Sequence, residues 1–311
     1  MTEHTIGIDV SKDHLDAHKL PDGIARQFAN TPAGIKTLIG WIGPDPARIV
    51  FEPTGAYHRQ LEMRLAEAGL PIVKINPRQA KRFAQAIGQL AKTDRLDAAM
   101  LARMGALLDL QPRPVPTANQ RDLKDLHVAR EALIKDRTAA ANRAKTLLLP
   151  VLKRQNNARS KQINIQLAEI DAAIMALIKA DPELARKLAV LTSIPGIAAI
   201  TAAMLISEMP ELGTLDEKQI AALAGLAPIA RQSGKWSGKA FVQGGRKKVR
   251  NGLYMPALVA MRYNPDLKAI YQALTARGKA PKQAITAVMR KLLIIANALL
   301  RKGTTWKDQM A

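Results

Sequence analysis

The 311-residue chain contains no cysteine, which excludes disulfides, cysteine-ligated zinc, iron–sulfur clusters and thiol nucleophiles. Its five histidines are too scattered along the sequence to indicate a zinc site. No apolar run approaches the ~20 residues of a membrane span, and the first residues lack the basic and apolar parts of a signal peptide. We therefore expect a soluble, cytoplasmic protein without a membrane partner.

Acidic residues are scarce relative to basic ones: 26 Asp and Glu stand against 47 Lys and Arg, for a net charge of +21. This imbalance argues against an ordinary small-metabolite enzyme and favours a polyanionic partner, nucleic acid or an anionic membrane. The excess is uneven, because residues 1–110 carry a net +2 and residues 111–311 a net +19. Between them, three prolines in residues 111–117 indicate an extended linker. An ordinary loop within one domain is the alternative.

The first third predicts an α/β domain. Residues 5–10 alternate in polarity and are rich in β-branched side chains, as expected of a strand. Proline and glycine punctuation then predicts further strands and helices, in the order strand, strand, strand, helix, strand, helix, strand, helix: 5–10, 15–19, 26–29, from 31, 48–52, 57–68, 71–75 and from 77. This order predicts a mixed sheet with helices on its faces.

Four acids in this domain predict a metal site: Asp9, Glu52, Asp94 and Asp97. Asp9 and Glu52 lie at the ends of two predicted strands, and they meet at one sheet edge if those strands are neighbours. Asp94 and Asp97, three residues apart, share one face at the start of a predicted helix. Converging carboxylates need a cation, and Mg²⁺ or Mn²⁺ is the natural one. The alternatives are solvated acids and favourable helix-dipole contacts; Asp13 and Asp16 are further acids nearby.

Two long helices are expected in the middle of the chain. Residues 119–149 are strong helix formers, and Pro150 is expected to stop them. A second helix over 161–180 has apolar residues at alternating spacings of four and three, which is typical of a coiled coil: Ile163, Leu167, Ile170, Ile174 and Leu177. The seam would be buried by antiparallel pairing of the two helices or by pairing between subunits. The basic surface of this arm suits a solvated spacer and a nucleic-acid contact equally.

The last third combines a helical turn, a glycine-rich basic segment and apolar helices over 253–261, 265–276 and 281–300. Residues 193–205 are expected to form a turn between two helices, and Pro195-Gly196 at this bend resembles the turn of a helix–hairpin–helix, although a plain helical hairpin fits equally. Residues 231–250 carry seven basic residues, four glycines and no acid, which predicts contacts with nucleic-acid phosphates. The candidate contacts are Arg231, Lys235, Lys239, Arg246, Lys247, Lys248 and Arg250.

Ser233 and Ser237 lie within this basic segment. A serine hydroxyl is a poor nucleophile unless its proton is removed or its alkoxide is stabilised, and nearby cations favour both. On chemistry alone, a phosphate-contacting or capping role is the ordinary interpretation, and the two serines are equal candidates.

Several blocks together resemble one family, the DEDD transposases of the insertion sequence 110 type, which are bridge-RNA-guided DNA recombinases. The similarity runs nearly end to end, over Gly7-Ile-Asp9-Val-Ser-Lys, Glu52-Pro-Thr-Gly-Ala-Tyr57, Lys92-Thr-Asp94-Arg-Leu-Asp97-Ala, Ile194-Pro-Gly-Ile and Gly225-Leu-Ala-Pro…Gln232-Ser-Gly. The resemblance implies an RNase H-like, Holliday-resolvase-like metal domain over 1–110, a linker and coiled coil over 111–185, and a mainly α-helical transposase domain over 186–311.

The resemblance also implies a mechanism. The four acids Asp9, Glu52, Asp94 and Asp97 would hold the metal, and Ser233, chosen over Ser237 by the family pattern, would attack a DNA phosphate to form a phosphoserine link. Donor and target double-stranded DNA, a guide RNA, and dimers that pair into tetramers would be the partners. Two rivals stay open: a structure-selective nuclease in which water attacks, and a non-catalytic nucleic-acid-binding protein.

Overall fold

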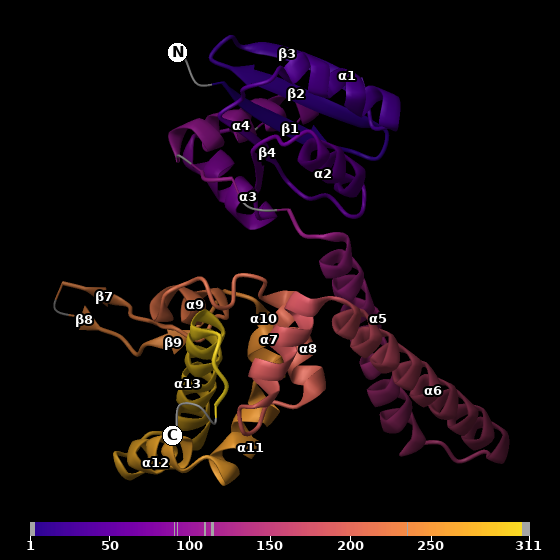
Figure 1. Cartoon of the computed structure of the whole chain (residues 1–311), viewed down its shortest axis with the longest axis vertical. Coiled ribbons are helices and arrows are strands. Elements are labelled where there is room, and N and C mark those ends of the chain that lie inside the picture. The colour runs from indigo at the N-terminus through magenta and orange to yellow at the C-terminus, as the bar shows by residue number, and fades with distance from the viewer. Residues whose placement is uncertain are drawn as a thin grey trace. The chain divides into compact units, whose positions relative to one another are not determined.

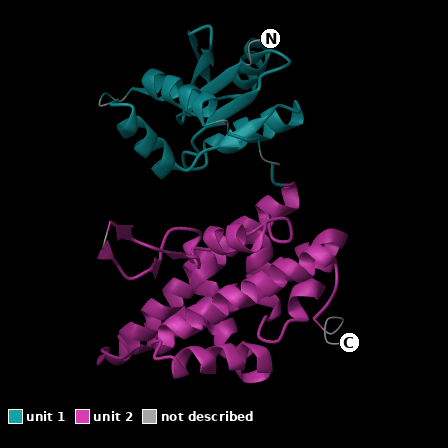
Figure 2. Cartoon of the chain, turned by 90° about the vertical axis from the view of Figure 1, so that its left-hand side faces the viewer, with its two compact units in different colours: residues 1–116 teal, residues 117–311 magenta. Residues whose placement is uncertain are grey.

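The computed structural model describes residues 4–89, 91, 93–108, 110–112, 115–234 and 236–306. The chain divides into two compact units, Met1–Pro116 and Thr117–Ala311 (Figure 2). The break falls within the predicted proline-rich linker, of which Arg113 and Pro114 lie outside the described residues. Each unit has its own hydrophobic core.

A five-stranded mixed sheet forms the centre of the first unit (Figure 1). Its strands lie in the order β3-β2-β1-β4-β5, with β2 antiparallel to both β1 and β3, and β4 parallel to both β1 and β5. The bounds are β1 Thr5–Val10, β2 His14–Leu20, β3 Ile24–Ala29, β4 Arg48–Phe51 and β5 Ile72–Lys74. The mixed sheet confirms the sequence prediction. The first and fourth strands are neighbours, which is the condition under which Asp9 and Glu52 meet at one sheet edge.

Helices cover both faces of this sheet. Ile6, Ile8 and Phe51 face one core with residues of α1 (Pro32–Ile42) and α2 (His58–Glu67). On the other face, Val50 and Val73 pack with α3 (Pro77–Ala86) and α4 (Asp94–Leu107). Because successive strand residues point to opposite faces, Gly7 and Asp9 lie on the α4 side of β1.

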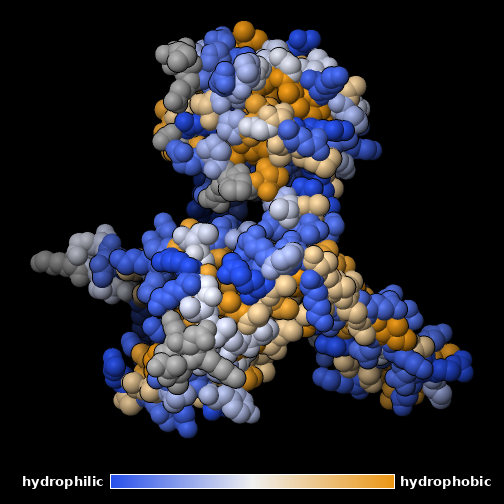
Figure 3. All heavy atoms as spheres, viewed as in Figure 1, coloured by the Kyte–Doolittle hydropathy of each residue, from blue (hydrophilic) through white to orange (hydrophobic). Residues whose placement is uncertain are grey.

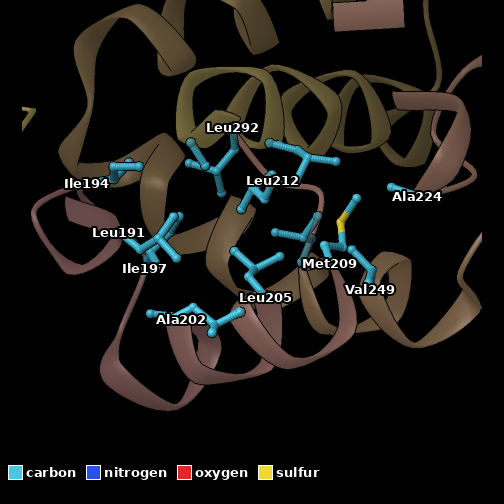
Figure 4. Close-up of a cluster of buried hydrophobic side chains, with 14 of the residues drawn as sticks. Leu191, Ile194, Ile197, Ala202, Leu205, Met209, Leu212, Ala224, Val249 and Leu292 are labelled. Atoms are coloured by element: carbon cyan, nitrogen blue, oxygen red, sulfur yellow. The ribbon is translucent and has the colours of Figure 1, made fainter. Parts of the chain in front are cut away.

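The second unit is mostly helical, as predicted. Its core contains apolar residues from all nine helices that the structure describes in this unit. Leu191, Leu205, Met209 and Leu292 are among the core residues labelled in Figure 4. The helices are α5 Ala118–Ala144, α6 Pro150–Ala180, α7 Pro182–Thr192, α8 Ala199–Glu208, α9 Glu217–Leu223, α10 Lys247–Gly252, α11 Tyr254–Tyr263, α12 Pro265–Ala276 and α13 Pro281–Lys302. Among the described residues, α13 alone is long and apolar enough to cross a membrane, and most of it is buried in this core.

The middle of the chain forms a helical hairpin in which α5 and α6 pack side by side. Pro150 begins α6 rather than ending the helix before it, so the predicted bounds 119–149 and 161–180 are wrong. Proline is tolerated in the first helical turn, where its missing amide leaves no hydrogen bond unmade. Ile163, Leu167 and Ile174 of the predicted seam are buried. A supercoiled coiled coil stays a prediction.

Two polar contacts also join the hairpin helices. Arg130 Nε lies 2.5 Å from Asp171 Oδ1, and the buried Asn156 donates its amide to the carbonyl oxygen of Ala140 at 3.1 Å. In Figure 3 the arm that α5 and α6 form carries hydrophobic patches among hydrophilic ones. Its loop exposes Leu148 and Leu149.

The turn between α7 and α8 is packed against another helix. Gly196 has a φ of 98°, and a Cβ added to it would lie 2.7 Å from the carbonyl oxygen of Pro256 and 2.8 Å from the amide nitrogen of Ala260. Glycine is therefore required there for backbone conformation and for close packing on α11. This geometry gives the turn a packing role and favours the plain helical hairpin over a phosphate-binding turn.

Candidate active site

Two parallel strands place Asp9 and Glu52 side by side. In the register between β1 and β4, Ile8 is paired with Phe51, so Asp9 comes next in β1 and Glu52 directly follows the end of β4. Gly7 and Val50 are also paired, and Val50 belongs to the core on the α4 side. By strand alternation, both carboxylates occupy the α4 side of the carboxyl ends of these strands.

The start of α4 lies over the same place. A Cβ added to Gly7 would lie 2.1 Å from the carbonyl oxygen of Ala98 and 2.4 Å from the amide nitrogen of Ala102, so β1 and α4 touch through their main chains. A Cβ at Gly105 would meet Thr5, at the other end of β1. The helix therefore runs antiparallel to β1.

The helix begins with a capped turn. Thr93 accepts a hydrogen bond from the amide of Leu96 at 3.3 Å. Asp94 and Asp97 occupy the first turn, so the direction of α4 brings both acids toward Asp9.

The carboxylates act on one another electrostatically. Burial raises the pKa of Asp9 to about 6, with further contributions from the negative charges of Asp94, Asp97, Asp16 and Glu52. Asp9 and three of these neighbours are the four acids that the sequence singled out, and Asp16 is the fifth. The structure thus brings Asp9, Glu52, Asp94 and Asp97 into one electrostatic cluster.

Asp16 is a fifth acid near this cluster, and the sequence pattern assigns it no role. It is the cross-strand partner of Asp9 in the β1–β2 hairpin, and both of its carboxylate oxygens accept hydrogen bonds from Gln27 at 3.2 Å. Directly opposed like charges destabilise a strand pair. This opposition could have been inferred from the antiparallel register, because the position of the turn between β1 and β2 places Asp9 opposite Asp16.

The donor atoms of this cluster suit a divalent cation, but the side chains are not arranged around an ion site. Carboxylate oxygens are the ligands that Mg²⁺ and Mn²⁺ prefer. A cation would relieve the repulsion that, together with the larger effect of burial, raises the pKa of Asp9. Within the described parts of the chain, no three acidic or histidine side chains lie close enough to hold an ion as they stand. Asp97 instead accepts a long hydrogen bond from Gln89, at 3.4 Å.

Ser233 lies in the second unit, on a small β-hairpin that projects from its helices (Figure 1). The strands at its tip are β7 (Gln232–Ser233) and β8 (Trp236–Ser237); those at its base are β6 (Pro228–Ile229) and β9 (Phe241–Val242). Ser233 is paired with Trp236, and Ser237 with Gln232. The two serines therefore point to opposite faces of the hairpin, which distinguishes candidates that the residues alone left equal.

The predicted nucleic-acid contacts differ in their surroundings. Lys239 and Lys247 are exposed, and Arg231 lies 4.6 Å from the centre of the Phe241 ring. Lys235 lies outside the described residues. The other three predicted contacts, Arg246, Lys248 and Arg250, have partners within the chain.

Arg246 and Lys248 pair with acids that lie far from them in sequence. Arg246 makes two hydrogen bonds of 2.6 Å to the carboxylate of Glu211 and one of 2.7 Å to the carbonyl oxygen of Glu208. Lys248 Nζ lies 3.0 Å from Glu131 and 3.2 Å from Glu208. Burial alone would lower the pKa of Lys248, but these two acids raise it above its ordinary value.

Arg250 closes the base of the hairpin. Its Nη1 donates to the carbonyl oxygens of Gly244, at 2.8 Å, and Gly225, at 3.2 Å. A Cβ added to Gly245 would lie 2.2 Å from the amide nitrogen of Gly225. The chain therefore enters and leaves the hairpin through one tight crossing, which only glycine permits.

Replacing Arg246 with Ala is expected to destabilise the second unit by about 2 kcal/mol, because Glu211 and the Glu208 carbonyl lose charge-assisted partners. The exposed neighbour Lys247 gives the matched control. Lys247→Ala should leave the melting temperature unchanged and reduce the salt dependence of DNA binding by about one phosphate contact. Calorimetry and salt-dependent DNA titration measure the two effects. Equal stability of both variants would contradict the structural role of Arg246.

Comparisons with known proteins cover both units. A family model described as a transposase, the DEDD type of IS110, matches residues 6–152, and one described as the transposase IS116/IS110/IS902 family matches residues 188–272. Pilin gene-inverting proteins of Moraxella bovis and Moraxella lacunata are each 31% identical over 321 residues, covering 97% of this chain and 97% of each relative.

One partial relative and one solved structure add to these. An uncharacterized 43.6 kDa protein of insertion element IS110 from Streptomyces coelicolor is 31% identical over 48% of this chain and 36% of its own length. T. thermophilus RuvC in complex with a Holliday junction substrate has 14% identity and a TM-score of 0.26, covering 36% of this chain and 100% of RuvC; a likeness at this level carries no inference. On the family models and the full-length relatives, the chain belongs to the IS116/IS110/IS902 family of transposases.

Proposed function

We propose that this transposase is a site-specific DNA recombinase that cleaves and rejoins DNA through a covalent link to Ser233. The observation that carries the proposal is the pairing of Ser233 with Trp236 at the exposed tip of a basic hairpin, with no acid between residues 231 and 250. An exposed serine there meets the phosphates of a nucleic acid rather than the interior of its own fold.

In the proposed reaction, Ser233 Oγ forms a bond to a DNA phosphorus and loses its proton. The phosphorus–oxygen bond to the leaving strand breaks, and the leaving oxygen takes up a proton. Rejoining is the reverse reaction on a new strand end, in which a DNA hydroxyl displaces the serine. The phosphoester bond energy is conserved, so no nucleotide cofactor is required.

Asp9, Glu52, Asp94 and Asp97 are proposed to hold Mg²⁺ or Mn²⁺ in an RNase H-like first unit. When bound, such an ion supplies charge stabilisation at a phosphate. The chain's own contribution is the set of carboxylates, and with a pKa of about 6 Asp9 is mainly ionised at neutral pH. Repulsion among these acids supports the assignment, because a bound cation would neutralise their charges and lower the electrostatic energy of the cluster.

The proposed partners are donor and target double-stranded DNA, an element-encoded guide RNA, and further copies of the chain in dimers and tetramers. The charge of residues 111–311, a net +19, supports a large polyanionic partner. Guidance by RNA and a catalytic centre shared between subunits rest on the family resemblance. Arg231, Lys239 and Lys247 are the proposed phosphate contacts that the structure describes as exposed or beside an aromatic ring.

The test is a denaturing gel of the protein with DNA carrying the element ends, its RNA and Mg²⁺. We expect a covalent protein–DNA band for the wild type and for Ser237→Ala, and none for Ser233→Ala. Ser237→Ala is the matched control, because Ser237 lies on the opposite face of the same hairpin. Cleavage without a covalent band in all three proteins would instead indicate a metal-dependent nuclease in which water attacks.

A further inference from the structure

The hairpin that carries Ser233 also presents a large aromatic side chain. Trp236 is 60% exposed and belongs to none of the hydrophobic clusters that the described residues form. Tryptophan is normally highly buried, and leaving such a surface in water forgoes the free energy of its burial. The exposed ring is therefore a candidate contact for a partner.

The ring shares a face with the proposed nucleophile. Ser233 and Trp236 are directly paired across β7 and β8, and side chains so paired point to the same side, with Cβ atoms about 5 Å apart. A partner that brings a phosphate to Ser233 must therefore pass beside the indole ring.

The orientation of the ring is held by a glycine. A Cβ added to Gly238 would lie 2.4, 2.8 and 3.0 Å from three carbon atoms of the Trp236 ring, so the ring lies against the main chain there. Contact with a backbone on one side and exposure on the rest makes the indole a fixed platform. The amide of Gly238 donates to the carbonyl oxygen of Arg231 at 2.8 Å, which secures that backbone.

Charge around the ring identifies the kind of partner. Residues 231–250 contain no acid. Arg231 and Lys239 lie in the hairpin itself, Lys239 is exposed, and the guanidinium of Arg231 lies 4.6 Å from the Phe241 ring. Single-stranded nucleic acid offers both negative phosphates and flat aromatic faces, and proteins bind it with this combination of cations and aromatic platforms. In a paired, stacked duplex the faces of the bases are covered.

We propose that Trp236 stacks on an unpaired DNA base next to the phosphate that Ser233 attacks. The inference rests on the proposed function and adds a base contact to it. Stacking would hold the nucleotide beside Ser233 and favour local opening of the duplex at the cleavage point. The contact is tolerant of sequence, because every base has a stacking face.

The experiment compares the affinity of the full-length protein for a single-stranded DNA oligonucleotide, its duplex and the same strand as RNA. Wild type, Trp236→Ala, Trp236→Phe and Tyr263→Ala are titrated by fluorescence anisotropy. Tyr263 is the matched control, since it is 72% exposed on α11 of the same unit. Circular dichroism checks that every variant is folded.

We expect Trp236→Ala to weaken single-stranded DNA binding about tenfold, with Trp236→Phe intermediate and Tyr263→Ala unchanged. Duplex affinity and the slope of affinity against salt should not change, because the phosphate contacts remain. An unchanged single-strand affinity, or an equal loss on duplex, would overturn the proposal. A loss confined to RNA would assign the platform to RNA and overturn the assignment to DNA.

The outcome is separable from that of the recombinase proposal. A covalent band that depends on Ser233, with normal single-strand binding by Trp236→Ala, would overturn the stacking contact and leave the recombinase standing. A single-strand defect in Trp236→Ala, with no covalent band from the wild type, would support the stacking contact and contradict the serine mechanism.

Discussion

Replacing Asp9 with Asn is expected to lower Mg²⁺-dependent strand cleavage at least about a thousandfold, since ions in such sites stabilise charge by several kcal/mol. The same substitution is expected to raise the melting temperature of the metal-free protein at neutral pH. Asn carries no charge, so it removes the repulsion with Asp94, Asp97, Asp16 and Glu52 and the cost of burying a carboxylate. A variant that loses activity while gaining stability has not lost activity by misfolding, so the loss can be assigned to the missing carboxylate.

The pH dependence follows from the same group. The pKa of Asp9 is about 6 in the fold, against an ordinary value of 3.8, so the native state holds this proton more tightly than the unfolded chain does. The contribution of Asp9 to stability is therefore most favourable below about pH 4 and is lost as the pH rises through about 6. Asp9→Asn should flatten this part of the stability curve, and the stabilisation of the wild type by Mg²⁺ should fade as the pH drops below about 6.

Asp13→Asn provides the control, because it makes the same change of charge at an exposed residue that does not contribute to the pKa of Asp9. Thermal unfolding with EDTA and with Mg²⁺, at about pH 5 and about pH 8, measures the stability effects. A melting temperature of Asp9→Asn at or below that of Asp13→Asn in EDTA would refute the electrostatic account of the cluster.

Replacing Gly7 with Ala is expected to destabilise the first unit by about 3 kcal/mol, at the upper end of the cost of overpacking. The new Cβ would lie 2.1 Å from the Ala98 carbonyl oxygen and 2.4 Å from the Ala102 amide nitrogen. Both are main-chain atoms of α4, so the clash is relieved only by moving the helix. Because α4 carries Asp94 and Asp97, the stabilisation by Mg²⁺ should weaken as well.

Gly40 gives the matched comparison for Gly7. It lies within α1, and a Cβ added there meets no atom within 4 Å. Gly40→Ala should therefore raise stability by up to ~1 kcal/mol through its better helix propensity. Differential scanning calorimetry of both variants makes the measurement, and a Gly7→Ala unfolding curve that matches the wild type would contradict the close contact of β1 with α4.

Local sequence signals were enough to predict the mixed sheet, and they singled out four acids whose charges act on one another in the fold; a metal site there stays a prediction. The alternation of polar and apolar residues indicates where the strands lie. Two neighbouring parallel strands then bring Asp9 and Glu52 together at their ends. The approach of α4 depends on Gly7 and Gly105, which meet atoms more than 90 residues and more than 50 residues away in sequence. Such contacts have no local signature, and the opposition of Asp16 and Asp9 likewise depends on the register of a hairpin.

The sequence is a poorer guide to structure where one residue type serves two purposes. Pro150 both ends and begins helices in proteins, and here it begins α6. Arg246, Lys248 and Arg250 have the composition of a phosphate-binding run, but Glu131, Glu208 and Glu211 meet the first two from distant helices and loops. Basic residues in such a run look alike in sequence. Only their distant partners show which side chains are held by ion pairs within the fold and which are free to bind a phosphate.

The crossing of the chain at Gly225 and Gly245 has a consequence for how this protein can diverge. Everything between these glycines leaves and rejoins the helical unit at one point, held by Arg250. The tip can therefore change in length or in side chains while the core of α7, α8 and α13 keeps its packing. Evolution can therefore revise the residues around Ser233 in this hairpin, which we propose to contact nucleic acid, independently of the helical scaffold that supports them.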